Sequence, residues 1–281
     1  MGRLYLGTSG FSYPHWRGVF YPLDLSERRW LEYLSGKLSS VELNVTFYRL
    51  PKRDIFETWG RRVPDDFGFT VKGNRLITHI HRLKNVKEEV ATFFSSLEGL
   101  GKKLAAVLWQ LPPSQRLDLP LIKDFLETIK EYNIRHAFEF RHESWWNEET
   151  LALLKRYGSA FVDSDMIRSH ISPLEIEMPF YFIRRHGPSG RYRGRYTRDD
   201  LQKMAASIFK LIMDDHDVFV YFNNDMEGYA VTNALELKDI LNGMGFDKIL
   251  GGQLEGEEDK QRRDIQGQDN QTRTGQGKAS K

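Results

Sequence analysis

The feature that most constrains the fold is a repeated alternation of short β-prone runs with longer segments of helical periodicity. The β-prone runs are Leu4–Thr8, Val41–Asn44, Phe67–Lys72, Ala105–Gln110, Ala137–Arg141, Ala160–Asp165, Tyr181–Arg185 and Val218–Asn224. The helical segments between them include Leu119–Tyr132, Asn147–Tyr157 and Thr197–Asp215, and Asn147 and Thr197 are good helix N-caps. Eight strands with intervening helices predict an α/β fold, a single-domain (β/α)₈ TIM barrel.

The competing architecture is an open, doubly wound sheet. It would normally carry a glycine-rich phosphate turn after the first strand, and the segment Leu6–Tyr13 does not fit that fingerprint. We expect the barrel domain to span 1–250. The remaining 251–281 form a low-complexity segment without aromatic residues, which predicts a disordered tail because it has too little apolar surface to bury.

Composition narrows the classes of function. The chain of 281 residues contains no cysteine, so disulfides, thiolate nucleophiles and cysteine-ligated metals are excluded. Its formal charge of +2 is too small to imply a polyanionic partner without local clustering. It has no apolar run of about 18 residues and no apolar leader, so we expect a cytoplasmic protein without a membrane partner. The oligomeric state is left open.

The run Ala137–Arg141 carries charges where a core strand should be apolar. Because strand side chains alternate between faces, Phe138 and Phe140 are expected to pack under the helices, while Glu139 and Arg141 point into the barrel near its C-terminal rim. The same interpretation places Phe182 under the helices. Burying charges is costly, so a polar rim favours an active or binding site. A satisfied ion-pair network that only closes the barrel top is the alternative.

The candidate catalytic residues are Glu139, Asp163 and His186. Neighbouring arginines could push the two carboxyl pKa values apart for general acid and base roles, and His186 could carry a proton. The candidate substrate-binding residues are Tyr13, Trp16, Asn44, Tyr48, Lys72, His79, Gln110, Arg141, His142, Trp145, Arg184 and Asn223. The aromatic members suit stacking on sugars or bases, although loops packed over the rim would explain them equally well.

A basic loop follows the seventh predicted strand. Between Arg184 and Tyr196 it holds Arg191, Arg193 and Arg195, which we predict to bind phosphate. Arginine suits bidentate phosphate contacts, and barrels often bind phosphate near strands seven and eight. A solvated, mobile surface loop is the alternative.

The cofactor is left open, and a divalent metal is the minority alternative. Possible ligands are Glu139, Asp163, Asp165, His186, His79 and His142. Against a metal, the eighth strand ends in Asn223 and Asn224 instead of an acid, and nearby cations such as Lys72 would compete for the same carboxylates.

Seven segments, taken together, resemble a known family. They are Gly7–Pro22, Val41–Pro51, Phe69–His79, Leu108–Ser114, Phe138–Trp146, Arg184–Gly187 and Tyr221–Asp225. Their sequence and order resemble the domain of unknown function 72 family, the YecE-like proteins. The resemblance implies a (β/α)₈ barrel with a rim of shared polar residues, of a type similar to metal-dependent sugar isomerases and apurinic endonucleases. The family usually has Tyr-x-Arg-Leu-His-Gly where this chain has Arg185 in the apolar position, which leaves the packing of Arg185 in question.

These observations predict an enzyme of hydrolase or phosphodiesterase/lyase type. It would act on a phosphate-bearing ligand, a nucleic acid or a sugar phosphate, at the barrel rim. The alternative is a non-catalytic nucleic-acid or nucleotide-binding protein, in which the polar rim only shapes a pocket.

Overall fold

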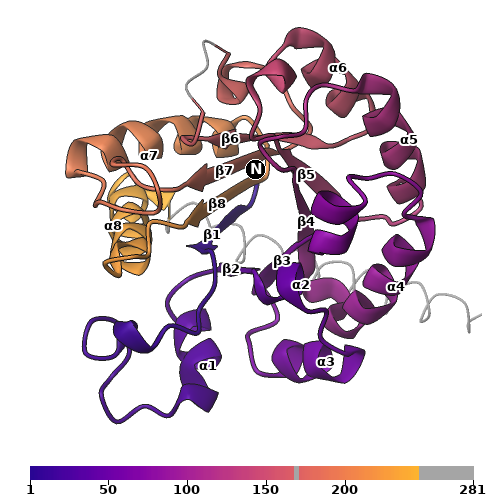
Figure 1. Cartoon of the computed structure of the whole chain (residues 1–281). Coiled ribbons are helices and arrows are strands. Elements are labelled where there is room, and N and C mark those ends of the chain that lie inside the picture. The colour runs from indigo at the N-terminus through magenta and orange to yellow at the C-terminus, as the bar shows by residue number, and fades with distance from the viewer. Residues whose placement is uncertain (168–170, 247–281) are drawn as a thin grey trace, which may run out of the picture. The chain divides into compact units, whose positions relative to one another are not determined.

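The computed structural model describes residues 1–167 and 171–246 (Figure 1). Its eight strands are parallel and follow the order β1-β8-β7-β6-β5-β4-β3-β2. They are β1 (Leu4–Thr8), β2 (Ser40–Leu43), β3 (Gly68–Lys72), β4 (Leu104–Gln110), β5 (Arg135–Glu139), β6 (Ala160–Ser164), β7 (Tyr181–Arg185) and β8 (Val218–Phe222). All eight predicted strands are present, with ends within two residues of those expected. The predicted barrel is confirmed.

Helices follow most strands, and in Figure 1 they lie outside the sheet. They are α1 (Trp30–Ser35), α2 (Val45–Tyr48), α3 (Arg53–Arg61), α4 (Lys87–Leu97), α5 (Leu119–Ile129), α6 (Glu148–Arg156), α7 (Arg198–Met213) and α8 (Tyr229–Gly243). The predicted N-caps are confirmed, since Asn147 accepts a hydrogen bond from the backbone of Thr150, and Thr197 forms a reciprocal capping box with Asp200. In its described part, the β6–β7 connection carries only the short helical turn Pro173–Glu175.

The barrel is nearly closed, and its seam lies between β1 and β2. A single bridge pairs Ser9 with Glu42, in place of a full ladder. Backbones approach closely here, because a Cβ on Gly7 would lie 2.1 Å from the carbonyl oxygen of Ser40, so only glycine fits. The Ser39 hydroxyl also bridges the strands, accepting from the amide of Leu6 at 2.9 Å and donating to the carbonyl of Leu4 at 3.1 Å.

Strand alternation divides the barrel interior into layers. Apart from Tyr221, a cluster of buried residues in the barrel consists of Tyr5, Ala105, Ala106, Leu108, Ala137, Ala160, Val162, Phe180, Phe182 and Phe219. Above it, the hydroxyl of Tyr221 bonds the hydroxyls of Ser40 at 2.6 Å and Thr70 at 2.7 Å. Two residues further along the inward faces of β2, β3 and β5 come Glu42, Lys72 and Glu139. The fold therefore delivers charged groups to the C-terminal end of the barrel.

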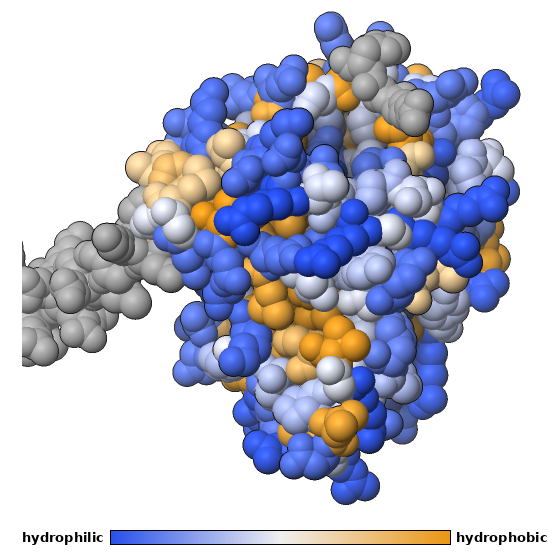
Figure 2. All heavy atoms as spheres, turned by 90° about the vertical axis from the view of Figure 1, so that its left-hand side faces the viewer, coloured by the Kyte–Doolittle hydropathy of each residue, from blue (hydrophilic) through white to orange (hydrophobic). Residues whose placement is uncertain are grey.

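The segment between β1 and α1 forms an excursion with its own aromatic core. Trp16 is fully buried, and the ring of Tyr21 stacks on Trp30 with centroids 4.7 Å apart. Two apolar side chains remain outside, with Val19 64% and Leu23 76% exposed. In Figure 2, hydrophobic side chains lie among hydrophilic ones in the lower part of the face, at the level where Figure 1 shows this excursion.

The chain divides into two compact units, Met1–Leu237 and Lys238–Lys281. The first contains all eight strands, and the described part of the second includes the end of α8 at Gly243. The tail expected at 251–281 lies outside the described residues. Among the helices that the structure describes, none combines the length and apolar character needed to cross a bilayer.

Candidate functional site

The innermost part of the barrel top is a buried group of four side chains that we name the floor cluster: Glu42, Glu139, Arg184 and His186. Each is at most 1% exposed. Arg184 donates from Nε and Nη2 to the two carboxylate oxygens of Glu42, at 2.9 and 2.6 Å. Its Nη1 donates to Oε2 of Glu139. Although burial alone would lower the pKa of Arg184, the two carboxylates raise it, so one charged guanidinium joins β2, β5 and β7.

Glu139 contacts four side chains, one of which is Arg184. Its Oε1 lies 2.7 Å from Nε of Arg141, at an angle that makes this contact an ion pair without a hydrogen bond. The same oxygen lies 3.2 Å from Nε2 of His186 and 3.3 Å from the hydroxyl of Ser164. Burial would raise the pKa of Glu139, but the charges of Arg141 and Arg184 hold it well below its usual range. Glu139 is therefore an ionised carboxylate.

His186 is held in one orientation by contacts on both ring nitrogens. The side-chain amide of Asn223 lies 3.1 Å from Nδ1, and the Glu139 carboxylate lies beside Nε2. A hydrogen bond donated from Asn223 leaves the ring proton on Nε2, facing the carboxylate. The backbone amide of His186 donates to Asp165 at 2.8 Å. Burial and the charge of Arg184 lower the pKa of His186, so the ring is neutral at neutral pH.

A second set of polar side chains surrounds the opening above the floor cluster, and we name it the mouth group: Asn44, Lys72, His79, Gln110 and Arg141. They follow β2, β3, β4 and β5, so they occupy one continuous arc of the barrel. Each of the five residues is partly accessible, in contrast to the floor cluster, although the side chain of Arg141 is only 8% exposed. This arc is where a ligand could meet polar side chains that are less completely enclosed than the floor cluster.

Lys72 is the most distinctive member of the mouth group. Its Nζ lies 4.5 Å from the centroid of the Phe47 ring, a cation–π contact. Among the described residues it has no hydrogen-bonding or ion-pairing partner. Burial, then the charge of Arg184, lower the pKa of Lys72 to about 8, against the opposing pull of Glu42 and Glu139.

His79 belongs to a turn of π-helix, Leu76–Ile80, a form often found at functional sites. The Thr78 hydroxyl donates to the carbonyl of Asn74 at 3.2 Å and lies 2.9 Å from Nδ1 of His79. The tautomer that satisfies both contacts has the ring proton on Nδ1 and a lone pair on Nε2. Burial, then the charge of Lys72, lower the pKa of His79 to about 4, so the ring is a neutral acceptor at neutral pH.

The remaining members of the mouth group also offer unused polar atoms. The buried Oδ1 of Asn44 has no hydrogen-bonding partner, and the side chain of Gln110 has none in the part of the chain that the structure describes. A cleft of about 540 Å³ opens beside Asn44 and is also lined by Tyr13, Phe11 and Trp59. It gives a bound molecule room to extend from the barrel mouth toward the excursion between β1 and α1.

Within the floor cluster and the mouth group, cations outnumber carboxylates by one, and the carboxylate of Asp165, outside the two groups, accepts from the backbone amide of His186. Lys72, Arg141 and Arg184 supply three cations against the carboxylates of Glu42 and Glu139. The charges of Arg75 and Arg82 also reach the mouth group, because they contribute to the low pKa of His79. The arrangement favours an anion.

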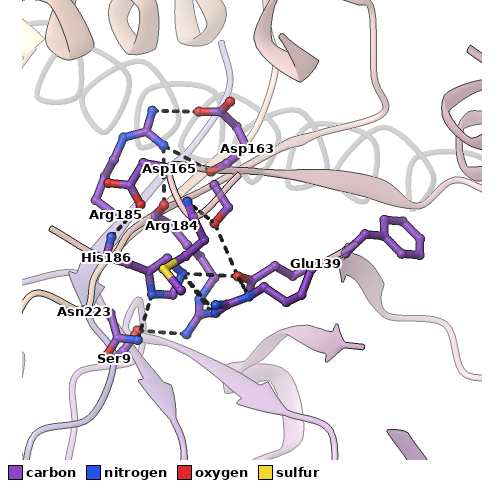
Figure 3. Close-up of polar contacts among 12 residues, drawn as sticks. Ser9, Glu139, Asp163, Asp165, Arg184, Arg185, His186 and Asn223 are labelled. Carbon is purple, nitrogen blue, oxygen red and sulfur yellow. Dashed lines mark hydrogen bonds and ion pairs between the residues drawn. The ribbon is translucent and has the colours of Figure 1, made fainter. Parts of the chain in front are cut away.

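Two placements expected from the sequence are wrong, and Figure 3 illustrates the first, which concerns Asp163. Asp163 does not join Glu139, because the inward residues of β6 are Ala160, Val162 and Ser164. Instead, Oδ2 of Asp163 accepts from Nη2 of Arg185 at 2.6 Å, away from Glu139 (Figure 3). This pair also accounts for Arg185 at a position that is apolar in the resembling family.

The second error concerns β7. Phe182 lies inside the barrel, stacked on Phe219 with centroids 5.6 Å apart and tilted against Tyr221. It shares its face with Arg184, so the face assigned from the sequence was inverted. The pattern of apolar residues could not reveal this, because the lower layer of the barrel is itself apolar.

Several predicted binding residues serve packing or capping. Trp16 donates to Asp225 at 2.7 Å, and Trp145 donates to the carbonyl of Gln115 at 2.8 Å, both from buried rings. His142 caps a short turn through Ser144. By contrast Tyr48 is 73% exposed. Tyr13 lies at the cleft, and its hydroxyl donates to the carbonyl of Ser9 at 2.7 Å.

The predicted phosphate loop does not converge on one point. Arg195 pairs with Glu236, and Nε of Arg193 contacts the sulfur of Met226 at 3.3 Å. Arg191 is exposed and has a φ of 51°. The loop touches the floor cluster through Tyr192, whose ring meets His186 edge-on at 5.5 Å.

The possible metal ligands named from the sequence also do not converge. Within residues 1–167 and 171–246, no group of three or more histidine, aspartate or glutamate side chains is arranged to hold a metal ion. Glu139 and His186 are in contact, but the remaining oxygen of Glu139 is taken by Arg184. The barrel top is organised around arginine.

Three residues of the barrel top were missed as site residues. Glu42, Ser9 and Ser164 all contact Arg184 or Glu139. Alternation along β2 did place Glu42 inside, but its partner Arg184 lies 142 residues away in the chain. Glu42 could have been recognised as a site residue because it is an acid at an inward position of a strand and has no cation near it in the sequence.

The family model and one curated relative match most of this chain, and a second relative matches about half of it. The model of the family described as "Protein of unknown function DUF72" matches residues 5–252. The UPF0759 protein YunF of Bacillus subtilis is 28% identical over 271 residues, covering 85% of this chain and 95% of its own. The UPF0759 protein YecE of Escherichia coli is 28% identical over 154 residues, 53% of each chain.

Solved structures agree. A DUF72 family protein from Thermotoga maritima superposes with a TM-score of 0.75 at 32% identity, covering 85% of this chain and 99% of its own. A D-psicose 3-epimerase from Clostridium cellulolyticum superposes with a TM-score of 0.53 at 9% identity, covering 87% and 98%, a likeness of fold alone. The barrel, the match of nearly the full domain and the related structure together show that the chain belongs to the DUF72 family.

Proposed function

We propose that this protein is an enzyme of hydrolase or lyase type that acts on a phosphate-bearing ligand, such as a sugar phosphate or nucleic acid, at the mouth group. One observation carries the proposal: cationic side chains gather at the ends of β3 and β5, where Lys72 ends β3, Arg75 and Arg82 lie in the segment after it, and Arg141 follows β5. Lys72 and Arg75 have no acidic partner among the described residues. Charges gathered without compensation favour an anionic ligand.

The floor and mouth would have different roles in such an enzyme. Arginine and lysine at the mouth would bind phosphate oxygens, Arg141 through its guanidinium fork and Lys72 as a point charge. The floor cluster would hold Arg141 in place through Glu139. His79 is the accessible group with a free lone pair, so it is the best candidate for accepting a proton.

A second function is supported by the state of Glu139. Its carboxylate is ionised and already contacts Arg141, Arg184 and His186, so it has no proton to give at neutral pH. A protein that only binds nucleotides or nucleic acids needs no such proton. We therefore keep a non-catalytic binder as the alternative function.

Binding and turnover can be tested separately. Calorimetry with inorganic phosphate, a sugar phosphate, a nucleotide and an oligonucleotide would compare the wild type with the variants Lys72→Met and Arg75→Met. Each variant should weaken binding of the preferred ligand by about tenfold, because each removes one charge-assisted hydrogen bond. Arg61→Met removes a comparable exposed arginine from α3 and should leave binding unchanged.

Unchanged affinity in both mouth variants would overturn the phosphate proposal. Binding without any product formation across the same ligands would favour the non-catalytic alternative. Product formation that is lost in His79→Gln, while binding persists, would support the enzyme.

A further inference from the structure

We propose that Lys72 is a carbonyl-reactive amine that forms an imine with its ligand, which makes the ligand class a phosphorylated aldehyde or ketone. The phosphate part of this inference rests on the proposed function, whereas the reactivity of the amine does not. The position of the Lys72 amine over the Phe47 ring, without an acidic partner in the described part of the chain, leaves this amine available to react with a carbonyl group.

The geometry singles out Lys72 among the lysines. It is the last residue of β3, on the inward face that also carries Thr70. Its Nζ is held 4.5 Å above the Phe47 ring and contacts no acid or carbonyl in the described parts of the chain. Elsewhere, Lys103 donates to two backbone carbonyls at 2.8 Å, and Lys155 pairs with Glu177 at 2.8 Å.

The surroundings of Lys72 favour its uncharged form. Charged side chains approach it from several elements: Glu42 on β2, Glu139 and Arg141 at the end of β5, and Arg184 on β7. Burial is the largest cause that lowers the pKa of Lys72 to about 8, and the charges of Arg184 and Arg141 lower it further, against the opposing effect of Glu42 and Glu139. About a tenth of the amine is then uncharged at pH 7, against less than a thousandth for an ordinary lysine. An uncharged lysine beside other cations is the usual form of an amine nucleophile.

The reaction balances without a redox partner. The lone pair of Nζ attacks the carbonyl carbon, and the C=O π electrons move to oxygen. One proton passes from nitrogen to that oxygen, giving a carbinolamine. Loss of the hydroxyl group as water, with the second nitrogen proton, forms the C=N bond. The net change is amine plus carbonyl to imine plus water.

A carrier for these protons lies next to Lys72. The His79 ring meets Phe47 edge-on at 4.8 Å, so both side chains contact the same aromatic ring. Nε2 of His79 has the free lone pair described above, and the charge of Lys72 acts on this ring. His79 can therefore take the proton from nitrogen and return it to oxygen.

The test uses two aldehydes that differ by a phosphate, pyridoxal 5′-phosphate and pyridoxal. The full-length protein is incubated with each, reduced with borohydride, and the modified peptide is located by mass spectrometry. We expect one main adduct, on Lys72, formed about tenfold faster or more with the phosphorylated aldehyde. The variant Lys72→Arg keeps the charge but cannot form an imine, so it should lose this adduct.

The matched control is Lys123→Arg, the same substitution at an exposed lysine of α5, which should keep the Lys72 adduct. The thermal midpoint of Lys72→Arg shows whether that variant folds. Labelling of wild-type Lys72 should rise from pH 6 to 8 and then level off, following its pKa of about 8. Labelling of exposed lysines should still rise at about pH 9.

The outcomes separate the two proposals. Equal labelling of Lys72 by both aldehydes would keep the amine chemistry and overturn the phosphate ligand. Binding of the phosphorylated aldehyde without an adduct on Lys72 would overturn the imine and keep the phosphate site. Labelling spread over exposed lysines, unchanged in Lys72→Arg, would also overturn the imine.

Discussion

The floor cluster and the mouth group lie next to each other, but the charges of the floor cluster are paired with one another, whereas the charge of Lys72 in the mouth group is not paired with a described acid. In the floor cluster, Arg184 is shared between Glu42 and Glu139, and the histidine is fixed on both ring nitrogens. In the mouth group, Lys72 and the oxygen of Asn44 have no partners among the described residues. Fully paired buried charges hold a structure in one arrangement, whereas charges left unpaired near solvent are available to a ligand.

This comparison bears on the two explanations of the polar rim. The sequence left open a satisfied ion-pair network or a binding site. The ion-pair network is present around Arg184 at the floor, and the open polar groups at the mouth are where we propose that a ligand binds. A network that only closed the barrel would not need Lys72 above it.

The largest expected effect is on the floor cluster. Arg184→Met leaves Glu42 and Glu139 buried without their shared cation, so the free energy of unfolding should fall by about 3–5 kcal/mol. Urea denaturation measures this change. The control Arg61→Met, on the surface of α3, should change little. A decrease no greater than that of the control would mean that the floor cluster does not hold the barrel together.

A substitution in the mouth group, at Lys72, should change the free energy of unfolding by a smaller amount and in the opposite direction. The pKa of Lys72 is about 8 when folded and near 10.4 when unfolded, so the folded state disfavours its charge at pH 7. Lys72→Met should raise the free energy of unfolding by an amount on the order of 1 kcal/mol at pH 7. Between pH 8 and 10 the wild type gains stability, so the difference should narrow. A Lys72→Met variant less stable than the wild type at pH 7 would show that the mouth charge is compensated.

Lys103→Met provides the matched comparison among lysines. Its Nζ donates to the carbonyls of Gly60 and Val63, so its removal should lower stability. If the free energy of unfolding rises in Lys72→Met and falls in Lys103→Met, measured by the same urea denaturation, Lys103 stabilises the fold whereas Lys72 does not. That result would agree with a role for Lys72 in ligand binding.

The next prediction concerns the pKa of His79 and its change when phosphate binds. His79 should titrate near pH 4, and a phosphate anion bound beside Lys72 should raise its pKa, because negative charge stabilises the protonated ring. NMR of the histidine ring protons, with and without inorganic phosphate, measures both values. His186, enclosed by the floor cluster, should respond less. An equal response in the two rings would remove the distinction between floor and mouth.

The smallest effect is expected from the arginine loop. Replacing Arg191, Arg193 and Arg195 with alanine should reduce the slope of log affinity against log salt by about 0.7–0.9 for each phosphate that the loop no longer neutralises. Since Arg195 is paired with Glu236, we expect the loop to neutralise fewer than three phosphates. Salt titrations with single-stranded and duplex nucleic acid measure the slope. Identical slopes in parent and variant would mean that the loop is only solvated surface.

The sequence predicted the strands better than it predicted which way their side chains face. All eight runs were found because β-prone segments bounded by polar residues are a local signal. The inward position of Glu139 was also local, since charges alternate with phenylalanine along β5. Phe182 was misplaced because a barrel is apolar both inside and under its helices, so an aromatic residue fits either face.

The site was predicted in part, for a related reason. Lys72, His79, Arg141 and Arg184 do come together, because all lie at or just beyond the carboxyl ends of strands. Trp16 and Trp145 do not line an opening, because both side chains are buried. The burial of a tryptophan in a loop depends on tertiary packing, which the local sequence does not reveal. Glu42 could not be paired with Arg184 from the sequence, since nothing local connects residues 142 positions apart.

That separation has a consequence for how the protein is made. During synthesis β2 emerges early, while Arg184 becomes available only after 142 further residues have been added. Until then Glu42 has no counter-charge, and the seam between β1 and β2 rests on one bridge and a few serine contacts. We therefore expect Glu42 to stay hydrated until β7 has been made, and closure of the barrel around it to be a late step of folding.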